Sequence, residues 1–374
     1  MLRRLTLVLA AVCLAMAGCS PSMEVENQAY VLVMGLDEAG GGLEVTVRVP
    51  KIGQSEIKDG GKSGGSSYLT FAARGNSFAR CVDELQKLAP RELNLSHIML
   101  VVASAELAER ADFGDLVNAV AETPHLYTTA RFAVCEGRAA DFVAGMSNVI
   151  GTRLSAEITA MFDHYALRGF VPDSTLAELY YASNSVYSDP SAAVGIPDGE
   201  GESGGSDAET DAAGAENEKT PSRQIYSGAA VFREGVLALR LDADEAFLLS
   251  LAQGRVKTFL YDTGGAPCRI MRHSRPGREA AEASGRLVVS LDIDLTTVDP
   301  ISEETARRIE RELTQKLLDL IARCQAAGVD PFGFAERAAR RFATIPEWLA
   351  YGWRNRFSGA ETRVRVCLDC LDAS

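Results

Sequence analysis

The sequence lacks any apolar run long enough to cross a membrane as a helix, which needs about 20 consecutive apolar residues. Its clearest apolar segment, Leu5 to Ala17, is shorter than that and lies at the very start. The body of the chain is therefore expected to stay in water. Any attachment to a membrane must come from a different source.

Histidine is scarce, with only four residues: His97, His125, His164 and His273. None lies at zinc-ligand spacing from another histidine or from a cysteine, so we expect no metal and no cofactor. His97, in an apolar strand pattern, is expected to be a hydrogen-bonded core residue. Asp163 and His164 resemble an acid–base pair, but no serine or cysteine stands in a nucleophile elbow to use it. The sequence thus predicts a protein that is not an enzyme.

Positive charge is also in short supply, with 38 Lys and Arg against 51 Asp and Glu and a net charge of −13. This balance argues against a nucleic-acid partner and against electrostatic adhesion to anionic lipid. One basic cluster, from Cys268 to Glu279, stands out. It is interpreted either as a solvated hairpin tip or as a docking site for an acidic partner or lipid head groups.

Cysteines are thinly spread beyond the first nineteen residues: Cys81, Cys135, Cys268, Cys324, Cys367 and Cys370. Most are expected to be buried as small apolar residues. Only Cys367 and Cys370 have the C-x-x-C spacing of a metal or redox site. They lie in an alternating strand pattern without a second pair, so incidental placement is preferred to zinc or redox chemistry.

The start of the chain does carry a clear signal. Arg3 and Arg4 precede the apolar segment, in the order typical of an export signal. The segment ends in Met16-Ala17-Gly18-Cys19, which resembles the bacterial lipobox, although Met16 replaces the usual leucine. Residues 1–18 are therefore interpreted as a lipoprotein signal peptide, and Cys19 as the site of lipidation.

Residues 19–27 would form a polar, lipidated tether. A diacylglycerol on Cys19 supplies two acyl chains, which hold a protein on a membrane more firmly than one. Two alternatives remain open: an ordinary signal peptide cleaved at small residues, and an uncleaved N-terminal anchor.

Further along, strand patterns alternate with helical patterns, which indicates an α/β (α+β), multidomain protein with mixed sheets. Residues 28–188 are predicted to form an N-terminal α/β domain, interrupted by a glycine-rich insert near Gly60. Residues 189–222, acidic and glycine-rich with few large apolar groups, are predicted to form a linker. Residues 223–374 are predicted to form a C-terminal α/β domain.

Three elements carry strong local signals. A helix is expected over 152–182, and the longest helix over about 302–326, where Pro300 and Ser302 mark the start and Gly328 the stop. A strand hairpin is expected to turn at Glu234-Gly235.

Taken together, the leader and four later blocks resemble the C subunit of the spore germinant receptor, a lipoprotein family. The blocks are QAYVLVMGLDE with LEVTVRVP, NSFARCVDELQKLAPRELNLSHIMLVVASAELAER, SGAAVFREGVLALRLDADEAFLLSLAQGRVK, and VDPFGFAERAARRFATIPEWLAYGWRNRFSGAETRVRVCL. The glycine-rich insert, the acidic linker and the late C-x-x-C depart from the family pattern.

The resemblance implies a non-enzymatic protein that is lipid-anchored to the outer face of the spore inner membrane. There it would act with two membrane-embedded partners, the receptor A and B subunits, in germination in response to nutrients. The runner-up interpretation is a solute-binding lipoprotein of an uptake or sensing system, and an envelope hydrolase is a more distant alternative.

The late aromatic residues have two interpretations. Phe332, Phe334, Trp348 and Trp353 either belong to the core of the last domain, which is favoured, or contribute to partner docking.

Overall fold

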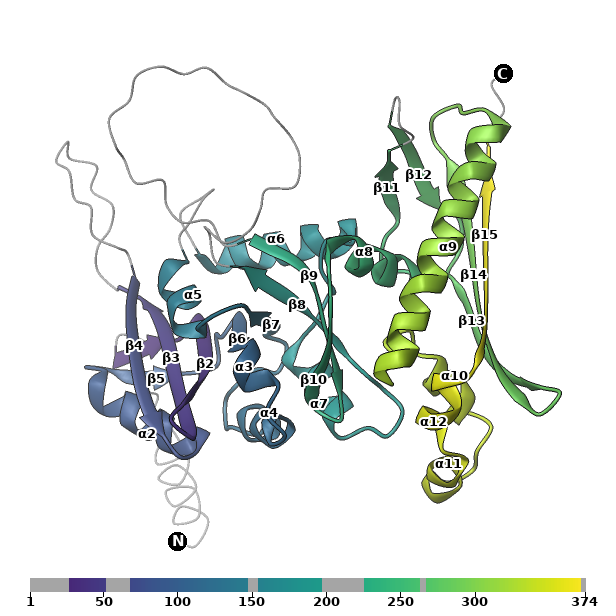
Figure 1. The fold of residues 1–374 in the computed structure, drawn as a ribbon. Helices are drawn as coiled ribbons and strands as arrows, with labels where there is room; N and C mark the ends of the chain where they lie inside the picture. The colour runs from purple at the N-terminus through teal and green to yellow at the C-terminus, as the bar shows by residue number, and fades with distance from the viewer. Residues whose placement is uncertain (1–26, 52–67, 147–153, 197–224, 263–266, 371–374) are drawn as a thin grey trace, which may run out of the picture.

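The computed structural model describes residues 27–51, 68–146, 154–196, 225–262 and 267–370. They form two halves, each built on its own β-sheet and lying side by side in Figure 1. We call residues 27–241 the first half and residues 242–370 the second half. The predicted mixed α/β fold is confirmed.

An eight-stranded sheet forms the first half, in the order β10-β9-β8-β7-β6-β2-β3-β4. Its strands are β2 (Val33–Ala39), β3 (Gly42–Pro50), β4 (Tyr68–Gly75), β6 (Leu100–Ser104), β7 (Arg131–Cys135), β8 (Ser191–Ile196), β9 (Ile225–Arg233) and β10 (Val236–Leu241). The four central strands are parallel, whereas both ends of the sheet are antiparallel. A separate parallel pair joins β1 (Gln28–Tyr30) to β5 (Glu92–Asn94).

Helices cover both faces of this sheet. The helices are α2 (Phe78–Leu88), α3 (Ala105–Ala108), α4 (Phe113–Ala121), α5 (Ala139–Gly145), α6 (Leu154–Arg168) and α7 (Leu176–Ser183). In β6, Leu100 and Val102 belong to the apolar cluster that includes residues of α5 and α6. Val101 and Ala103 belong to the opposite cluster, with residues of α2, α4 and α7. A strand covered on both faces needs apolar residues at nearly every position, and β6 has them.

Helix α5 is held at both ends by the sheet beneath it. At its start, Ala139 N and Ala140 N donate to the Asp37 carboxylate at 2.7 and 2.8 Å. At its end, the Arg48 guanidinium donates to carbonyl oxygens of three residues of the α5 C-terminus, at 2.5 to 2.9 Å. The negative charge of Asp37 lies at the positive, N-terminal end of the helix dipole, and the positive charge of Arg48 lies at its negative, C-terminal end. Both interactions stabilise the helix.

The second half has a sheet of five strands. These are β11 (Thr258–Tyr261), β12 (Cys268–Arg272), β13 (Gly277–Ala283), β14 (Arg286–Thr297) and β15 (Glu361–Asp369). Strand β14 pairs antiparallel with β12 and β13, and it pairs parallel with β15.

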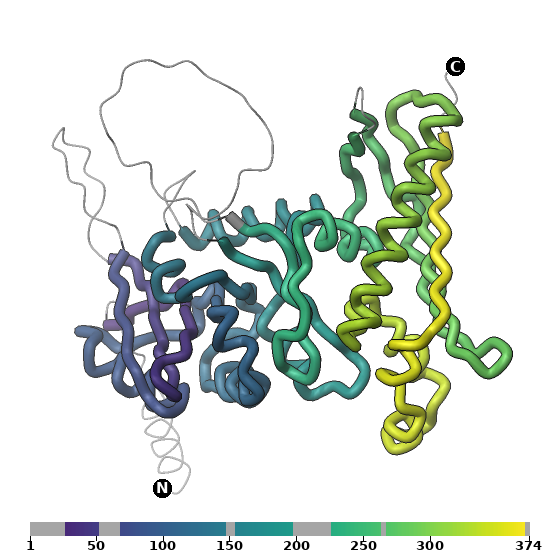
Figure 2. Tube along the Cα trace, viewed as in Figure 1, coloured from purple at the N-terminus to yellow at the C-terminus, as the bar shows by residue number. Residues whose placement is uncertain are grey.

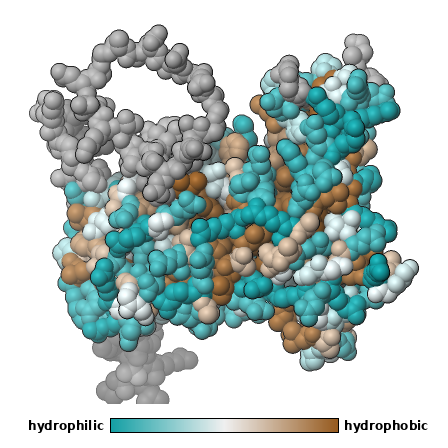
Figure 3. Space-filling view, in the orientation of Figure 1, coloured by the Kyte–Doolittle hydropathy of each residue, from teal (hydrophilic) through white to brown (hydrophobic). Residues whose placement is uncertain are grey.

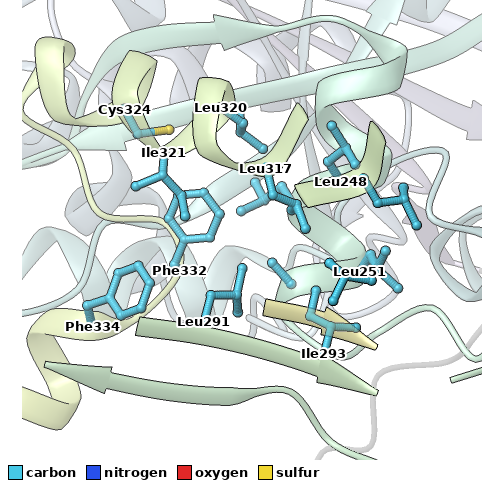
Figure 4. Close-up of a cluster of buried hydrophobic side chains, with 14 of the residues drawn as sticks. Leu248, Leu251, Leu291, Ile293, Leu317, Leu320, Ile321, Cys324, Phe332 and Phe334 are labelled. Carbon is cyan, nitrogen blue, oxygen red and sulfur yellow. The ribbon is translucent and has the colours of Figure 1, made fainter. Parts of the chain in front are cut away.

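One face of this sheet carries the core of the second half. Helices α8 (Ala243–Ala252) and α9 (Glu303–Ala327) supply leucines that meet Leu291 and Ile293 of β14, with Phe332 and Phe334 alongside (Figure 4). Figure 2 shows how α9 runs along the length of the sheet. Three short helices follow: α10 (Phe334–Ala339), α11 (Ile345–Tyr351) and α12 (Trp353–Ser358).

The end signals of the longest helix are confirmed. Ser302 accepts a hydrogen bond from Thr305 N at the start of α9, and Gly328 closes the helix with a φ of 68°. Glycine adopts this left-handed conformation without the steric cost that a side chain brings. The helix expected over 152–182 is instead two, α6 and α7, because the chain turns at Gly169, whose φ is 78°.

The predicted division of the chain needs one correction. Residues 191–196, assigned to the linker, form strand β8, because their small and apolar side chains suit a buried strand. The hairpin at Glu234-Gly235 is confirmed. Its two strands belong to the first sheet, whereas the prediction assigned them to a second domain that begins at residue 223. That each predicted domain folds by itself stays a prediction.

Several predicted segments lie outside the described residues: the leader, the lipidation site Cys19, the glycine-rich insert and linker residues 197–222. Within the part of the chain that is described, no helix combines the length and hydrophobicity that crossing a membrane requires.

Candidate functional site

The four aromatic residues singled out from the sequence all lie in the core of the second half. Phe332 and Phe334 are fully buried, and Trp348 and Trp353 are only 3% and 7% exposed. A buried side chain offers almost no surface to a partner while the protein stays folded. Their burial supports core packing, the favoured interpretation, and any docking in this region must use exposed neighbours of these rings.

The two tryptophans continue a stack of rings that reaches the boundary with the first half. The ring centroids of Trp348 and Trp353 lie 5.7 Å apart, and those of Trp353 and Phe357 lie 5.5 Å apart. Both pairs are stacked. The indole nitrogen of Trp348 donates to the carbonyl oxygen of Val186, in the first half, at 3.0 Å. Trp348 therefore joins the two halves as well as packing in one of them.

An ion pair crosses the same boundary, which we call the seam. The Asp189 carboxylate accepts hydrogen bonds from two nitrogens of the Arg354 guanidinium, both at 3.1 Å, and from Asp330 N at 2.8 Å. The Asp189 side chain is only 7% exposed. Because its charge is paired and hydrogen-bonded, burial of this carboxylate is tolerated, and its loss would leave Arg354 without its buried partner.

Asp330 is the second buried carboxylate at the seam. It accepts hydrogen bonds from backbone nitrogens of Phe332, Gly333 and Ala335, at 2.6 to 3.2 Å. Burial raises its pKa to about 7, against the lowering effect of those donors, and the nearby Asp189 charge raises it further. Asp330 is thus poised to change charge near neutral pH.

A cleft of about 490 Å³ opens along the seam next to these carboxylates. Its walls come from both halves, with Glu178 and Tyr181 of α7 on one side and Arg255, Arg278 and the 330–336 segment on the other. Arg255 also bonds across the seam, donating to a backbone carbonyl oxygen of the first half. Burial lowers the pKa of both arginines in the cleft.

A second groove, of about 430 Å³, lies beside Trp348. Two of its lining residues, Tyr181 and Ile345, are 59% and 55% exposed, and Leu349, which lies in α11 together with Ile345, is 59% exposed. The space-filling view shows apolar residues gathered at the lower end of the second half, over α11 (Figure 3). Clusters of exposed apolar side chains are typical of interaction surfaces.

The basic cluster does not form a hairpin tip. Cys268 to Arg272 belong to β12 and Gly277 to Glu279 to β13, and the two strands pair with β14 rather than with each other. Arg278 turns inward and donates to the carbonyl oxygen of Phe332 at 2.5 Å. The cluster is therefore divided between a half-buried arginine and an exposed connection.

Two further candidates from the sequence are the late cysteine pair and His97. Cys367 and Cys370 are half-buried and are not joined by a disulfide, and burial raises the pKa of Cys367, which opposes thiolate chemistry. His97 is exposed, with its ring edge-on to Tyr30 at 4.7 Å, so the prediction of a core histidine is wrong. In the described ranges, no three metal-ligating side chains come together in a way that could hold an ion.

Sequence reasoning misses Asp189, Arg354 and Arg255, and it marks Arg278 only as part of the basic cluster. Asp189 falls in the predicted linker because acidic residues dominate the following stretch. The signal available for Asp330 is its position before Pro331 and Gly333, since aspartate often caps its own backbone at such turns. Nothing local marks Asp189 and Arg354 as partners, because 165 positions separate them.

Comparison with known proteins finds two consecutive family models, which divide the chain before β9 and β10 rather than after them. A family model described as the spore germination protein N-terminal domain matches residues 21–194. A second, described as spore germination B3/GerAC-like, C-terminal, matches residues 227–370. The chain belongs to this GerAC-like family of spore germination proteins.

Relatives agree with that assignment. YfkR of Bacillus subtilis (strain 168), a protein named for spore germination, is 24% identical over 375 residues, which cover 94% of this chain and 92% of YfkR. The crystal structure of the GerBC protein has a TM-score of 0.52 and 14% identity, covering 91% of this chain and 97% of that one. The second likeness shows the shared fold. Membership of the GerAC-like family supports a role as the C subunit of a germinant receptor.

Proposed function

We propose that this GerAC-like chain is a non-enzymatic subunit that assembles with membrane-embedded A and B subunits of a germinant receptor. Lipidated Cys19 would hold it on the outer face of the spore inner membrane. The observation that carries the proposal is the match of two consecutive segments, residues 21–194 and 227–370, to the N-terminal and C-terminal models of spore germination proteins. A tether raises the effective concentration of the two halves beside the receptor without any new contact.

The lipid anchor is tested by replacing Cys19 with alanine, with Cys13→Ala in the apolar leader as the matched control. We expect Cys19→Ala to lose lipid incorporation and to leave the detergent phase or remain unprocessed, whereas Cys13→Ala should behave as the wild type. A Cys19→Ala protein that is still lipidated would contradict the anchor.

Docking is proposed to use exposed apolar residues at the Trp348 groove and on α11, where Ile345 lines the groove and Leu349 lies in the same helix. These side chains are more than half exposed and adjoin a rigid aromatic core, an arrangement that favours a protein partner. The occupant we propose is a surface of the A or B subunit outside the bilayer.

The docking proposal is tested with the double variant Ile345→Ser and Leu349→Ser. Leu260→Ser is the matched control, because Leu260 is 63% exposed on β11, away from this groove. We expect the double variant to remain folded, to lose copurification of A and B from detergent-solubilised membranes, and to fail to restore germination. Normal copurification would contradict docking at this groove.

A further inference from the structure

Strand β15 leaves one edge of the second sheet open. It pairs with β14 over all nine of its residues, in a register without a bulge. No other described strand pairs with it. An edge strand of this length presents a row of unpaired backbone groups, beside which another chain can add a strand.

One hydrogen bond shows which residues of β15 face the open edge. Leu368 N donates to Glu310 Oε1 of α9 at 2.7 Å, so this N–H points away from β14. Backbone groups alternate between the two sides along a strand, so the N–H and C=O groups of Val364 and Val366 point the same way. On that side, neither residue has a backbone hydrogen bond to any described residue. Both positions can therefore pair with an added strand.

A groove of about 780 Å³ follows this edge. Val364 and Val366 line it on the side of β15, and the flank of α9 from Arg308 to Gln315 lines it on the other side. Figure 1 shows β15 running beside α9. A strand added to β15 would therefore lie in this groove, with every second side chain turned towards α9.

The charges of the groove favour an acidic occupant. Its two carboxylates already accept hydrogen bonds, Glu310 from Leu368 N and Glu312 from the Tyr261 hydroxyl at 2.6 Å. Arg311 is exposed and forms no ion pair with a described residue. The charge left for a partner is therefore positive, in a chain with a net charge of −13. Complementary charge favours a segment that carries carboxylates.

A second copy of this chain fits the edge less well. In an antiparallel pair of β15 strands centred on Arg365, the two Arg365 side chains would face each other, and a pair centred on Val364 would set Arg363 against Arg365. Like charges directly opposite each other destabilise a sheet. A pair centred on Val366 would need the edge at Leu368, which Glu310 occupies.

We propose that the open edge of β15 accepts an extended, acidic segment of a partner protein as an added strand. Main-chain hydrogen bonds to Val364 and Val366 supply the affinity, and Arg311 favours acidic side chains in the groove. This inference does not depend on docking at the Trp348 groove, which has a different set of lining residues.

The test is binding of a fluorescein-labelled peptide of alternating glutamate and valine to the full-length chain in detergent, measured by fluorescence anisotropy. We expect saturation with a Kd below about 1 mM. A peptide of the same length with lysine in place of glutamate should bind at least tenfold more weakly. The proposal is overturned if neither peptide binds or if both bind equally.

Variants locate the site. Val364→Pro removes an N–H that faces the open edge without removing a hydrogen bond to β14, and edge strands tolerate proline at such positions. We expect at least a tenfold loss of peptide affinity, whereas the control Val364→Thr keeps the N–H and should bind as the wild type does. Unchanged affinity in a folded Val364→Pro protein would overturn the placement.

A charge reversal tests the groove without changing the strand. Arg311→Glu should weaken binding of the acidic peptide at least fivefold. Arg307→Glu is the matched control, because it makes the same change of charge on α9 at an exposed residue that does not line the groove. Equal affinities of the two variants would contradict recognition of the peptide by Arg311.

Amide hydrogen exchange, followed by NMR, reports the added strand itself. The bound peptide should slow exchange of the Val364 and Val366 amides at least tenfold and leave those of Arg363 and Arg365, which face β14, unchanged. No added protection at Val364 and Val366 would overturn the proposal. Sedimentation without peptide tests the other occupant: a dimer that Val364→Pro abolishes would assign the edge to a second copy and overturn the acidic partner.

Discussion

The two halves of this GerAC-like chain bury their sheets in different ways. In the first half, helices cover both faces of the eight-stranded sheet, and β6 is buried at all five positions. In the second half, α8 and α9 pack on one face, and from Val289 onward buried positions of β14 alternate with half-buried ones.

The alternation is visible in single residues. Leu291, Ile293 and Leu295 of β14 are buried, whereas Asp292 and Asp294 between them are half-buried on the other face. Continuous and alternating apolar patterns thus report how many faces of a sheet are covered. The second half keeps one polar sheet face that the first half lacks.

The largest expected effect tests this difference directly. Val102→Asp places a charge at a fully buried position of β6, and we expect the chain not to fold, since burying an unpaired carboxylate costs several kcal/mol. Thr296→Asp on the polar face of β14 should cost less than about 1 kcal/mol. Circular dichroism and urea unfolding measure both, and equal losses would refute the comparison.

A second experiment asks whether the halves unfold together. Phe132→Ala in the first half and Trp353→Ala in the second each remove a buried ring, at a cost of about 3 to 5 kcal/mol. Because Asp189, Arg354 and Trp348 link the halves, we expect both variants to shift one common transition. Two separate transitions, each shifted by one variant, would show that the seam does not couple the halves.

The ends of α5 supply a test within the first half. Arg48→Met removes the guanidinium that donates to the carbonyl oxygens at the α5 C-terminus, and we expect a loss of about 3 kcal/mol because buried acceptors lose their charged donor. Arg74→Met is the control, because Arg74 is 71% exposed and its buried partner Glu44 keeps a second ion pair with Arg138, so the loss should be less than about 1 kcal/mol. Chemical denaturation distinguishes the two, and similar losses would argue that Arg48 does not hold the end of α5.

The seam should make stability depend on pH. Burial raises the folded pKa of Asp330 from 3.8 to about 7, so the folded state binds the proton more tightly than the unfolded state does. The contribution of this group is greatest below pH 4 and is lost as the pH rises through 7. From about pH 5 to pH 8 the loss should be on the order of 2 kcal/mol. Asp330→Asn should flatten this part of the urea-unfolding profile, and an unchanged slope would contradict the assignment.

The smallest effect is expected on the polar face of the second sheet. Arg365 lies 2.8 Å from Asp292 and 3.5 Å from Asp294, but its side chain is 61% exposed. Exposed ion pairs contribute little, so Arg365→Gln should change the free energy of unfolding by no more than about 0.5 kcal/mol. A loss above about 2 kcal/mol in urea unfolding would mean that these charges are shielded from water. That result would contradict the exposure of Arg365 in the structure.

Much of the fold could be predicted because its signals are local. Ser302 and Gly328 mark the ends of α9 through hydrogen bonds and dihedral angles within a few residues. The turn at Glu234-Gly235 and the continuous apolar character of β6 are likewise contained in short stretches. The family resemblance is carried by such blocks in order, and the family models confirm it.

Local patterns could not show which distant segments meet. Strand β8 lies directly before an acidic, glycine-rich stretch. Because the composition of the whole segment is typical of a linker, the sequence did not indicate a strand there. The contact of Trp348 with Val186 requires the chain to fold back over 162 positions.

The sequence by itself determined the element types, the caps, the acidic charge and the family. Only the tertiary structure decided that β9 and β10 complete the first sheet, that Asp189 meets Arg354, and that Arg278 and Glu336 line one cleft. The physical reason is range. Helix periods and turns depend on neighbours along the chain, whereas sheet order, buried ion pairs and clefts depend on contacts that form only when the whole chain packs.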